Sequence, residues 1–139
     1  MNILAAAAGV ARVTLHNVRL SGNVNGMHAR SGVTVTASES VFAGNSAAGI
    51  FSDNTVAASF AVIRVHRSQV SGNATGVQAG SGAGVASSVV EISQNLIDFN
   101  TGNGVLISTG GQVDTFTNNS ITGNGTNGCA GCTNAAPGQ

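Results

Sequence analysis

The fold is decided by one stretch of sequence, Val70-Ser71-Gly72-Asn73-Ala74-Thr75-Gly76-Val77, whose pattern returns along the chain. The asparagine of this stretch has counterparts 22 to 28 residues apart, and all but one of them follow a glycine. The asparagines of this series are Asn23, Asn45, Asn73, Asn100 and Asn124. Repetition at such a period is typical of solenoid proteins, in which each repeat forms one turn of a rod.

Apolar residues recur at fixed distances from these asparagines. Three residues before each asparagine, the chain has Leu20, Phe42, Val70, Ile97 and Ile121. Eight residues before each, it has Leu15, Ala37, Val65, Ile92 and Phe116. A glycine follows each asparagine within four residues, and the residues after these glycines are Met27, Ile50, Val77, Val105 and Cys129. The three series predict three inward-facing columns of one stacked core.

Short stretches around these columns alternate between apolar and polar residues, as in Arg12-Val13-Thr14-Leu15-His16. A period of two is strand spacing, whereas the three-and-four spacing of a helix is absent. Each repeat therefore predicts three short strands, which pair in parallel with those of the next repeat about 4.8 Å away. The chain is expected to be all-β, with little or no helix.

The columns over residues 12 to about 128 resemble the right-handed parallel β-helix of the pectate-lyase-like superfold. The resemblance implies one domain over residues 1–139, a single-stranded right-handed parallel β-helix of about four to five coils. Residues 1–11 would form a partial first coil, and residues 129–139 a C-terminal tail. This superfold carries lyases, hydrolases, adhesins and phage tailspikes, so the resemblance does not assign an activity. By analogy it favours a secreted or cell-surface location.

The composition excludes several classes of partner. Charged residues are 7% of the 139-residue chain, the formal net charge is zero, and there is no lysine. Nucleic acids and anionic membranes bind clusters of lysine and arginine, so neither is an expected partner. No apolar stretch approaches the roughly 20 residues of a membrane-spanning helix.

The recurring asparagines have a structural interpretation. Asparagine tolerates the left-handed backbone conformation that a sharp corner requires. Stacked at one corner, the side-chain amides are expected to hydrogen-bond along the rod as a ladder. We favour this interpretation over a role in ligand binding.

Charged residues fall into columns that indicate pairing rather than catalysis. When the repeats are aligned on the asparagines, Glu39 lies beside Arg67, and Arg64 beside Glu91. No two acidic residues share a column in neighbouring repeats, whereas a glycosidase needs two carboxyls about 5–10 Å apart. The sequence also lacks the acidic cluster that would bind calcium in a lyase and the paired aspartates of a polygalacturonase. We therefore expect no catalytic residues and no cofactor.

The histidines are expected to be surface residues. His16 and His66 share an outward column with Ser38 between them, so their backbones lie two strand spacings, or about 9.6 Å, apart. One zinc ion is not expected to hold both, because its ligands lie about 2 Å from the metal. His28 lies in another outward column and has no evident partner.

The repeats vary most in length at one corner. The second repeat carries residues 52–60 there, and the third carries residues 79–87. Insertions in repeat proteins often mark the binding face, although tolerated surface loops are the plainer interpretation. If these loops border a groove, its binding residues are expected to be Asp53, Asn54, Arg64, His66 and Glu91.

Cys129 and Cys132 form a lone Cys-Ala-Gly-Cys motif. A structural zinc site needs four ligands and no second pair is present, so no metal is expected. Cys129 also occupies the inward column of Met27 and Ile50, where it suits a small core residue. A disulfide that fastens the last turn and two free thiols are the main alternatives, and a redox or metal role is a third.

The first residues, Met1–Ala11, are small and apolar but lack the basic leading region of a targeting segment. Ile3-Leu4-Ala5 aligns with Met27-His28-Ala29, which favours a partial first coil. Ile3 would then lie in an inward column with no cap before it, so we expect self-association, most simply a two-fold dimer through the N-terminal end. The outward apolar column of Phe51 and Leu106 offers a lateral interface instead.

Two functions are compatible with this sequence. The first is a non-enzymatic structural or binding module, as one segment of a larger surface or secreted solenoid. The second is a carbohydrate-binding or carbohydrate-active protein of the polysaccharide lyase or hydrolase kind, with a saccharide in the groove beside the variable loops.

Overall fold

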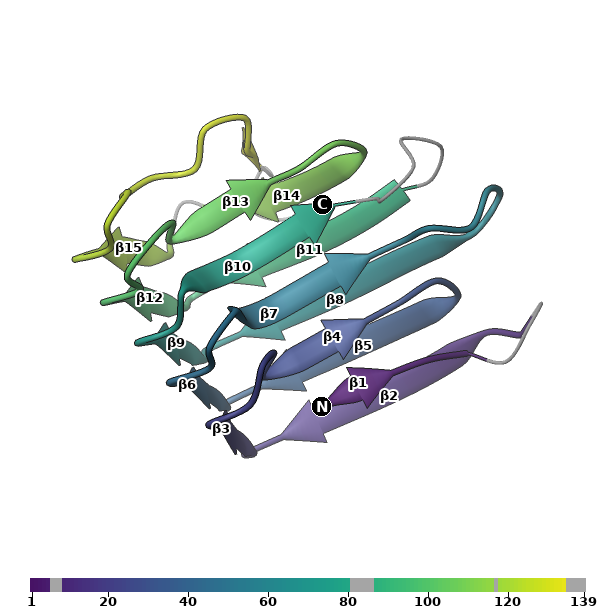
Figure 1. Cartoon of the computed structure of the whole chain (residues 1–139), viewed down its shortest axis with the longest axis horizontal. Helices are drawn as coiled ribbons and strands as arrows, with labels where there is room; N and C mark the ends of the chain where they lie inside the picture. Colours follow the sequence, from purple (N-terminus) through teal and green to yellow (C-terminus); the bar gives the residue numbers. More distant parts are fainter. Residues whose placement is uncertain (6–8, 81–86, 117, 135–139) are drawn as a thin grey trace.

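The chain folds into a rod of stacked turns in which three parallel sheets surround one core. The computed structural model describes residues 1–5, 9–80, 87–116 and 118–134. In Figure 1 the turns rise from purple to yellow along the chain. The fold is the expected right-handed parallel β-helix, with about four turns and no helix among the described residues.

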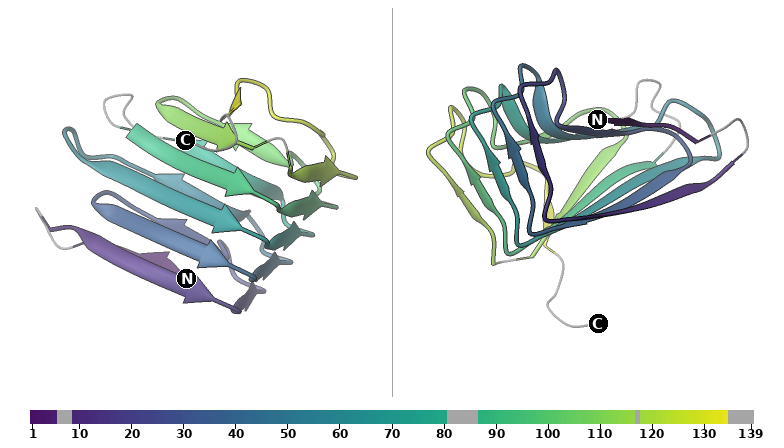
Figure 2. Two further views of the ribbon diagram at one scale, coloured as in Figure 1. Left: turned by 180° about the vertical axis from the view of Figure 1, so that it is seen from behind. Right: turned by 90° about the horizontal axis from the view of Figure 1, so that it is seen from below.

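Each sheet is built from every third strand. Sheet A has, in order, β1 (Asn2–Ile3), β4 (Met27–Ala29), β7 (Ala48–Asp53), β10 (Thr75–Gly80) and β13 (Val105–Ile107). Sheet B has β2 (Ala11–His16), β5 (Val33–Ser38), β8 (Phe60–His66), β11 (Ser87–Ser93), β14 (Gly111–Thr115) and β16 (Thr133–Asn134). Sheet C has β3 (Arg19–Ser21), β6 (Val41–Ala43), β9 (Gln69–Ser71), β12 (Leu96–Asp98) and β15 (Ser120–Thr122). The end-on view in Figure 2 shows the short sheet C linking the longer sheets A and B on one side.

The three predicted inward columns pack together as the core. Sheet C pairs Leu20, Phe42, Val70, Ile97 and Ile121 in register. Sheet A pairs Met27, Ile50, Val77 and Val105, and sheet B pairs Leu15, Ala37, Val65 and Ile92. In the middle turns these side chains are buried. Removing their apolar surface from water is the main force that closes each turn onto the next.

The pairing register of the strands departs from the prediction in the first and the last turn of the rod. At the start, Ile3 pairs with Ala29 rather than with Met27, a shift of two residues that keeps Ile3 facing inward. At the end, Ile92 pairs with Thr115 and not with the predicted Phe116. One additional residue in the last corner, between β14 and β15, causes this second shift.

The asparagine ladder is present and runs through the buried corner between sheets C and A. Asn45 donates from Nδ2 to Oδ1 of Asn73 at 2.8 Å, Asn73 to Asn100 at 2.9 Å, and Asn100 to Asn124 at 2.8 Å. Each of these oxygens also accepts the backbone N–H of the preceding asparagine. An amide recurs here because it supplies donors and an acceptor in one side chain.

The left-handed residue of this corner is the one before each asparagine. Positive φ values belong to Gly22, Gly44, Gly72, Phe99 and Gly123, whereas none of the ladder asparagines has one. The expectation that the asparagine itself is left-handed is therefore wrong. The preceding residue makes the sharp turn, and the asparagine side chain then points inward to the ladder.

A second ladder, which was not predicted from the sequence, occupies the corner between sheets B and C. The backbone N–H of Ser40 donates to Ser68 Oγ at 3.1 Å, and that of Ser68 to Asn95 Oδ1 at 2.9 Å. Asn95 continues the series to Asn119 Oδ1 at 2.9 Å. Two serines are followed by two asparagines in this ladder, so no single residue type recurs to reveal it.

Candidate functional site

Three of the five predicted binding residues lie on the outer face of sheet B. Arg64 and His66 are on β8, and Glu91 is on the neighbouring strand β11, in register with Arg64. Alternate residues of a strand share one face, so the structure brings these three side chains together. Asp53 lies instead on sheet A, and Asn54 is buried in the corner that follows it.

The charged residues on this face and at the adjoining corner form the predicted ion pairs. Arg64 donates from Nε to Glu91 Oε2 at 2.8 Å and from its terminal nitrogen to Oε1 at 3.1 Å, so both carboxylate oxygens are held. Arg67 donates to Glu39 at 2.9 Å. The Arg64 side chain is 42% exposed and that of Glu91 29%, so solvent screens this pair. Each pair contributes about 0.2–1 kcal/mol at most.

Glu91 and Asp114 are neighbours in one outward column. The expectation that no two acidic residues share a column in neighbouring repeats is therefore wrong, because the additional residue in the last corner shifts β14. Two carboxyls on adjacent strands suit the short separation used by retaining glycosidases, which is about 5–5.5 Å. Here Arg64 holds one carboxylate, and Gln112 donates to Asp114 Oδ1 at 2.7 Å.

The histidines of sheet B pair with serines in the predicted column. His16 Nδ1 lies 3.1 Å from Ser38 Oγ, and His66 Nδ1 contacts Ser93 Oγ. His16 Nε2 also lies 3.9 Å from a carboxylate oxygen of Glu39. Among the residues that the structure describes, no three His, Cys, Asp or Glu side chains lie close enough together to hold a metal ion.

A second cluster lies on the outer face of sheet A around Asp53. The expectation that His28 has no partner is wrong, because its ring stacks on Phe51 in the next strand, with ring centroids 4.5 Å apart. His28 Nε2 lies 3.7 Å from Asp53 Oδ2, and Arg30 Nε lies 3.9 Å from the same oxygen. Burial lowers the pKa of His28 and outweighs the opposing attraction of the Asp53 carboxylate. This histidine is therefore neutral at pH 7.

Asn54 closes the loop that follows β7. Its Nδ2 donates to the backbone oxygens of Ser59 at 2.8 Å and Ser87 at 3.2 Å, and its Oδ1 accepts from the backbone of Val56 at 3.2 Å. Asn54 is fully buried, so its side chain stabilises the loop. It does not lie in a surface groove, where the sequence predicted a binding residue. Of the second variable loop, residues 81–86 lie outside the described residues.

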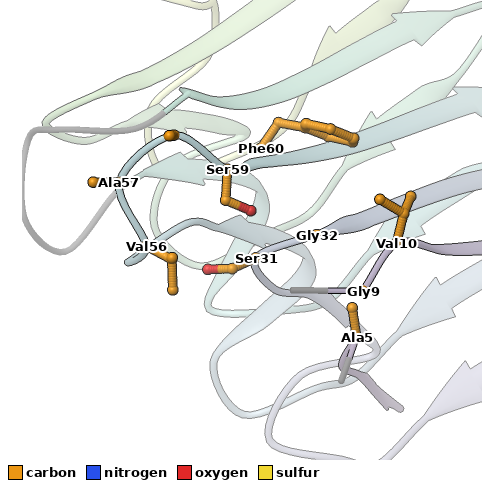
Figure 3. Close-up of a pocket in the computed structure, with 10 residues that line it drawn as sticks. Ala5, Gly9, Val10, Ser31, Gly32, Val56, Ala57, Ser59 and Phe60 are labelled. Carbon is orange, nitrogen blue, oxygen red and sulfur yellow. The ribbon is translucent and has the colours of Figure 1, made fainter. Parts of the chain in front are cut away.

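Two hollows meet at Phe60, a residue that is 40% exposed. The first, of about 510 Å³, is mostly apolar, and Figure 3 shows Val10, Val56 and Phe60 along its wall. The second, of about 460 Å³, lies over β2, β5 and β8 on the outer face of sheet B. We call it the sheet B groove. Residues that line it include Arg12, Thr14, Thr34, Thr36, Phe60 and Arg64.

Arg12, Thr34 and Phe60 line this groove but are not among the binding residues predicted from the sequence. Arg12 and Thr34 pair in register on β2 and β5, and both point outward. Arg12 and Thr34 occupy the same position in neighbouring repeats, and this shared position, rather than their residue type, is what could have shown that they lie side by side. Phe60 is the last residue of the first variable loop and the first residue of β8, so an aromatic residue at an outward strand start is the feature that could have revealed it.

The C-terminal segment adds to the last turn. Cys129 and Cys132 are joined by a disulfide, and both are partly buried against the core. The strand β16 then pairs with β14 at the edge of sheet B. Residues 135–139 of the expected tail lie outside the described residues.

A scan against protein-family models gave no match, and searches of the curated proteins and of the solved structures gave none either. In the described part of the chain, no helix is long and apolar enough to cross a membrane.

Proposed function

We propose that this β-helix is a non-enzymatic structural or binding module of the pectate-lyase-like kind. What supports the proposal most is that three of its five acidic side chains are paired with cations of neighbouring turns. The pairs are Glu39 with Arg67, Glu91 with Arg64, and Asp53 with Arg30. A catalytic acid or base needs an oxygen within reach of the substrate. Carboxylates that are held by arginines link neighbouring turns of the rod instead.

Turnover measurements test this proposal. Wild type and Glu91→Gln are incubated with a panel of neutral and acidic polysaccharides, and both new reducing ends and unsaturated products are measured. We expect neither protein to exceed a heat-denatured control, and Glu91→Gln to unfold at a lower temperature than wild type. Product formation by wild type that Glu91→Gln lacks, with an unchanged melting temperature, would make Glu91 catalytic and overturn the proposal.

A carbohydrate-binding or carbohydrate-active protein is the second candidate. It is favoured by the adjacent carboxyls of Glu91 and Asp114 and by the sheet B groove, which combines hydroxyl groups with an aromatic ring. The discriminating variant is Asp114→Asn, with Asp53→Ala on the other sheet as its control. Turnover that is lost only in Asp114→Asn would establish a carbohydrate-active enzyme on sheet B, whereas saccharide binding without turnover would establish a lectin-like module.

Self-association of the rod through its first turn is part of the proposal. The inward residues Val13, Leu15 and Leu20 of this turn are only partly buried, although Val35 and Phe42 beside two of them are fully buried. Such an exposed apolar edge favours a second copy of the chain. Light scattering tests it: we expect a dimer that Leu15→Glu dissociates. Dissociation by Leu106→Ser alone would move the interface to the lateral face of sheet A, and a monomer at high micromolar concentration would exclude both.

A further inference from the structure

We propose that the sheet B groove binds a carboxylate carried on a ring, with Arg12 holding the carboxylate and Phe60 holding one face of the ring. The inference builds on the proposed binding role and names the chemistry of its ligand. It concerns a place that the sequence does not assign, because only Arg64 of the predicted binding residues lines this groove.

The charge of the groove comes from Arg12. Arg12 is exposed and makes no ion pair with any residue in the described part of the chain, whereas Arg64 at the other side is neutralised by Glu91. No acidic side chain is among the residues that line the groove. A guanidinium with no partner binds a carboxylate through two parallel hydrogen bonds, which is the geometry arginine offers best. The ligand is therefore an anion of this planar kind.

The shape of the groove indicates that the anionic ligand also carries a ring. Phe60 and Val62 are successive outward residues of β8, so an aromatic face and an apolar floor lie side by side beneath the ligand. Aromatic side chains stack on flat apolar faces. Thr34 and Thr36 of β5 flank this floor with hydroxyls that both donate and accept hydrogen bonds. A volume of about 460 Å³ suits a molecule of one or two rings.

Other ligand classes use only part of this site. A phosphate ion would engage Arg12 and leave the ring of Phe60 uncovered. A neutral sugar would cover Phe60 and leave the charge of Arg12 without a counterpart. An acidic peptide would supply the carboxylate on a flexible chain and no ring.

Binding is measured by saturation-transfer NMR and calorimetry on the full chain with five probes. Sodium glucuronate and sodium benzoate carry the carboxylate on a sugar ring and on an aromatic ring. Glucose, inorganic phosphate and an N-acetylated glutamate amide are the probes that lack one part of this chemistry. We expect glucuronate, benzoate or both to bind at least about tenfold more tightly than any of the other three.

Matched variants assign the binding to this groove. Arg12→Gln removes the guanidinium, and Arg19→Gln is its control, because Arg19 is an exposed arginine of the same turn that lies on sheet C. We expect Arg12→Gln to weaken the ring acids about tenfold and Arg19→Gln to leave them unchanged. Phe60→Leu, which keeps an apolar side chain, is expected to weaken them less and to reduce the saturation transfer to the ring protons.

The outcomes separate the ligand sources and the competing explanations. Binding of glucuronate alone identifies a sugar acid, and binding of benzoate alone identifies an aromatic acid, both in support of the proposal. No binding of either acid, equal binding of any probe without a ring carboxylate, or equal effects of Arg12→Gln and Arg19→Gln would overturn it. Turnover is a separate readout, so product formation would end the non-enzymatic role without altering the binding result.

Discussion

Asn73 donates a hydrogen bond of 2.9 Å from its side-chain amide to Oδ1 of Asn100, its counterpart one turn further along the rod. The oxygen of Asn73 accepts in turn from both the backbone and the side chain of Asn45. Both Asn73 and Asn100 are buried. A buried donor or acceptor that loses its partner costs about 1–3 kcal/mol. One side chain therefore joins three turns, and its loss affects all of them.

Asn73→Ala is accordingly expected to lower the free energy of unfolding by about 3–5 kcal/mol, because it removes four buried hydrogen bonds. The Asn73 side chain accepts two of them from Asn45 and donates the other two to Phe42 O and Asn100 Oδ1. Asn23→Ala is the matched control. Asn23 is exposed at the end of the ladder, and its side chain donates only to the backbone of Ser21, so we expect a loss of less than about 1 kcal/mol. Urea unfolding followed by circular dichroism measures both. Equal losses would contradict the role of the ladder.

Phe99→Gly is expected to stabilise the protein by about 0.5–1 kcal/mol. Phe99 has a φ of 51° at a corner where the other turns place glycine, and the residue is 71% exposed. Glycine adopts this conformation without strain, and little packing is lost. The reverse change, Gly72→Ala at φ 64°, is expected to destabilise by a similar amount. Thermal unfolding of both variants checks the pair, and a destabilised Phe99→Gly would refute the strain.

Gly76→Ala is expected to destabilise the rod by about 1–3 kcal/mol or more. A Cβ atom at this position would lie 2.5 Å from the backbone oxygen of Gly104 and 2.8 Å from the ladder amide of Asn100. The next turn must then move away. Gly44→Ala separates crowding from backbone strain, since its Cβ would meet nothing within 4 Å but its φ is 63°. A smaller loss for Gly76→Ala than for Gly44→Ala would show that the turns are not tightly stacked there.

The stability of the protein is expected to fall as the pH drops below about 6.5, the ordinary pKa of histidine. Burial lowers the pKa of His28 in the folded protein, so the unfolded chain binds its proton first. The stability that neutral His28 contributes is fully present above the pKa of this histidine in the unfolded chain. It is lost as the pH falls through the pKa of His28 in the folded protein. His28→Gln removes this dependence and keeps a polar side chain. The measurement is the free energy of unfolding of wild type and His28→Gln at pH 7.5 and at pH 5. An equal change between the two pH values in both proteins would contradict this role of His28.

Much of the fold could be predicted because the core columns repeat at fixed distances from a recognisable residue. Counting from Asn73 and Asn100 places Arg64 opposite Glu91, and the structure confirms this ion pair. The same counting fails for Asp114, because one additional residue in the last corner displaces it relative to Asn124. Periodicity therefore identifies register only where the corners have equal length.

The candidate site could be predicted less well, because side-chain neighbours across strands depend on position rather than residue type. His28 and Phe51 are dissimilar residues that stack because they occupy the same outward column. The left-handed residue of each corner was also ambiguous, since either member of the pair Gly72-Asn73 tolerates that conformation. The sheet B groove depends on where the chain re-enters the sheet at Phe60, which no repeat encodes.

Hydrogen exchange of the asparagine side-chain amides tests the central claim most directly, namely that a buried ladder of asparagine amides links the successive turns of this rod. We expect the amide protons of Asn45, Asn73 and Asn100 in the ¹⁵N-labelled protein to exchange far more slowly than those of the exposed Asn23, because both hydrogens of each buried amide are donated within the rod. Exchange of all four amides at the same solvent-limited rate would contradict the account.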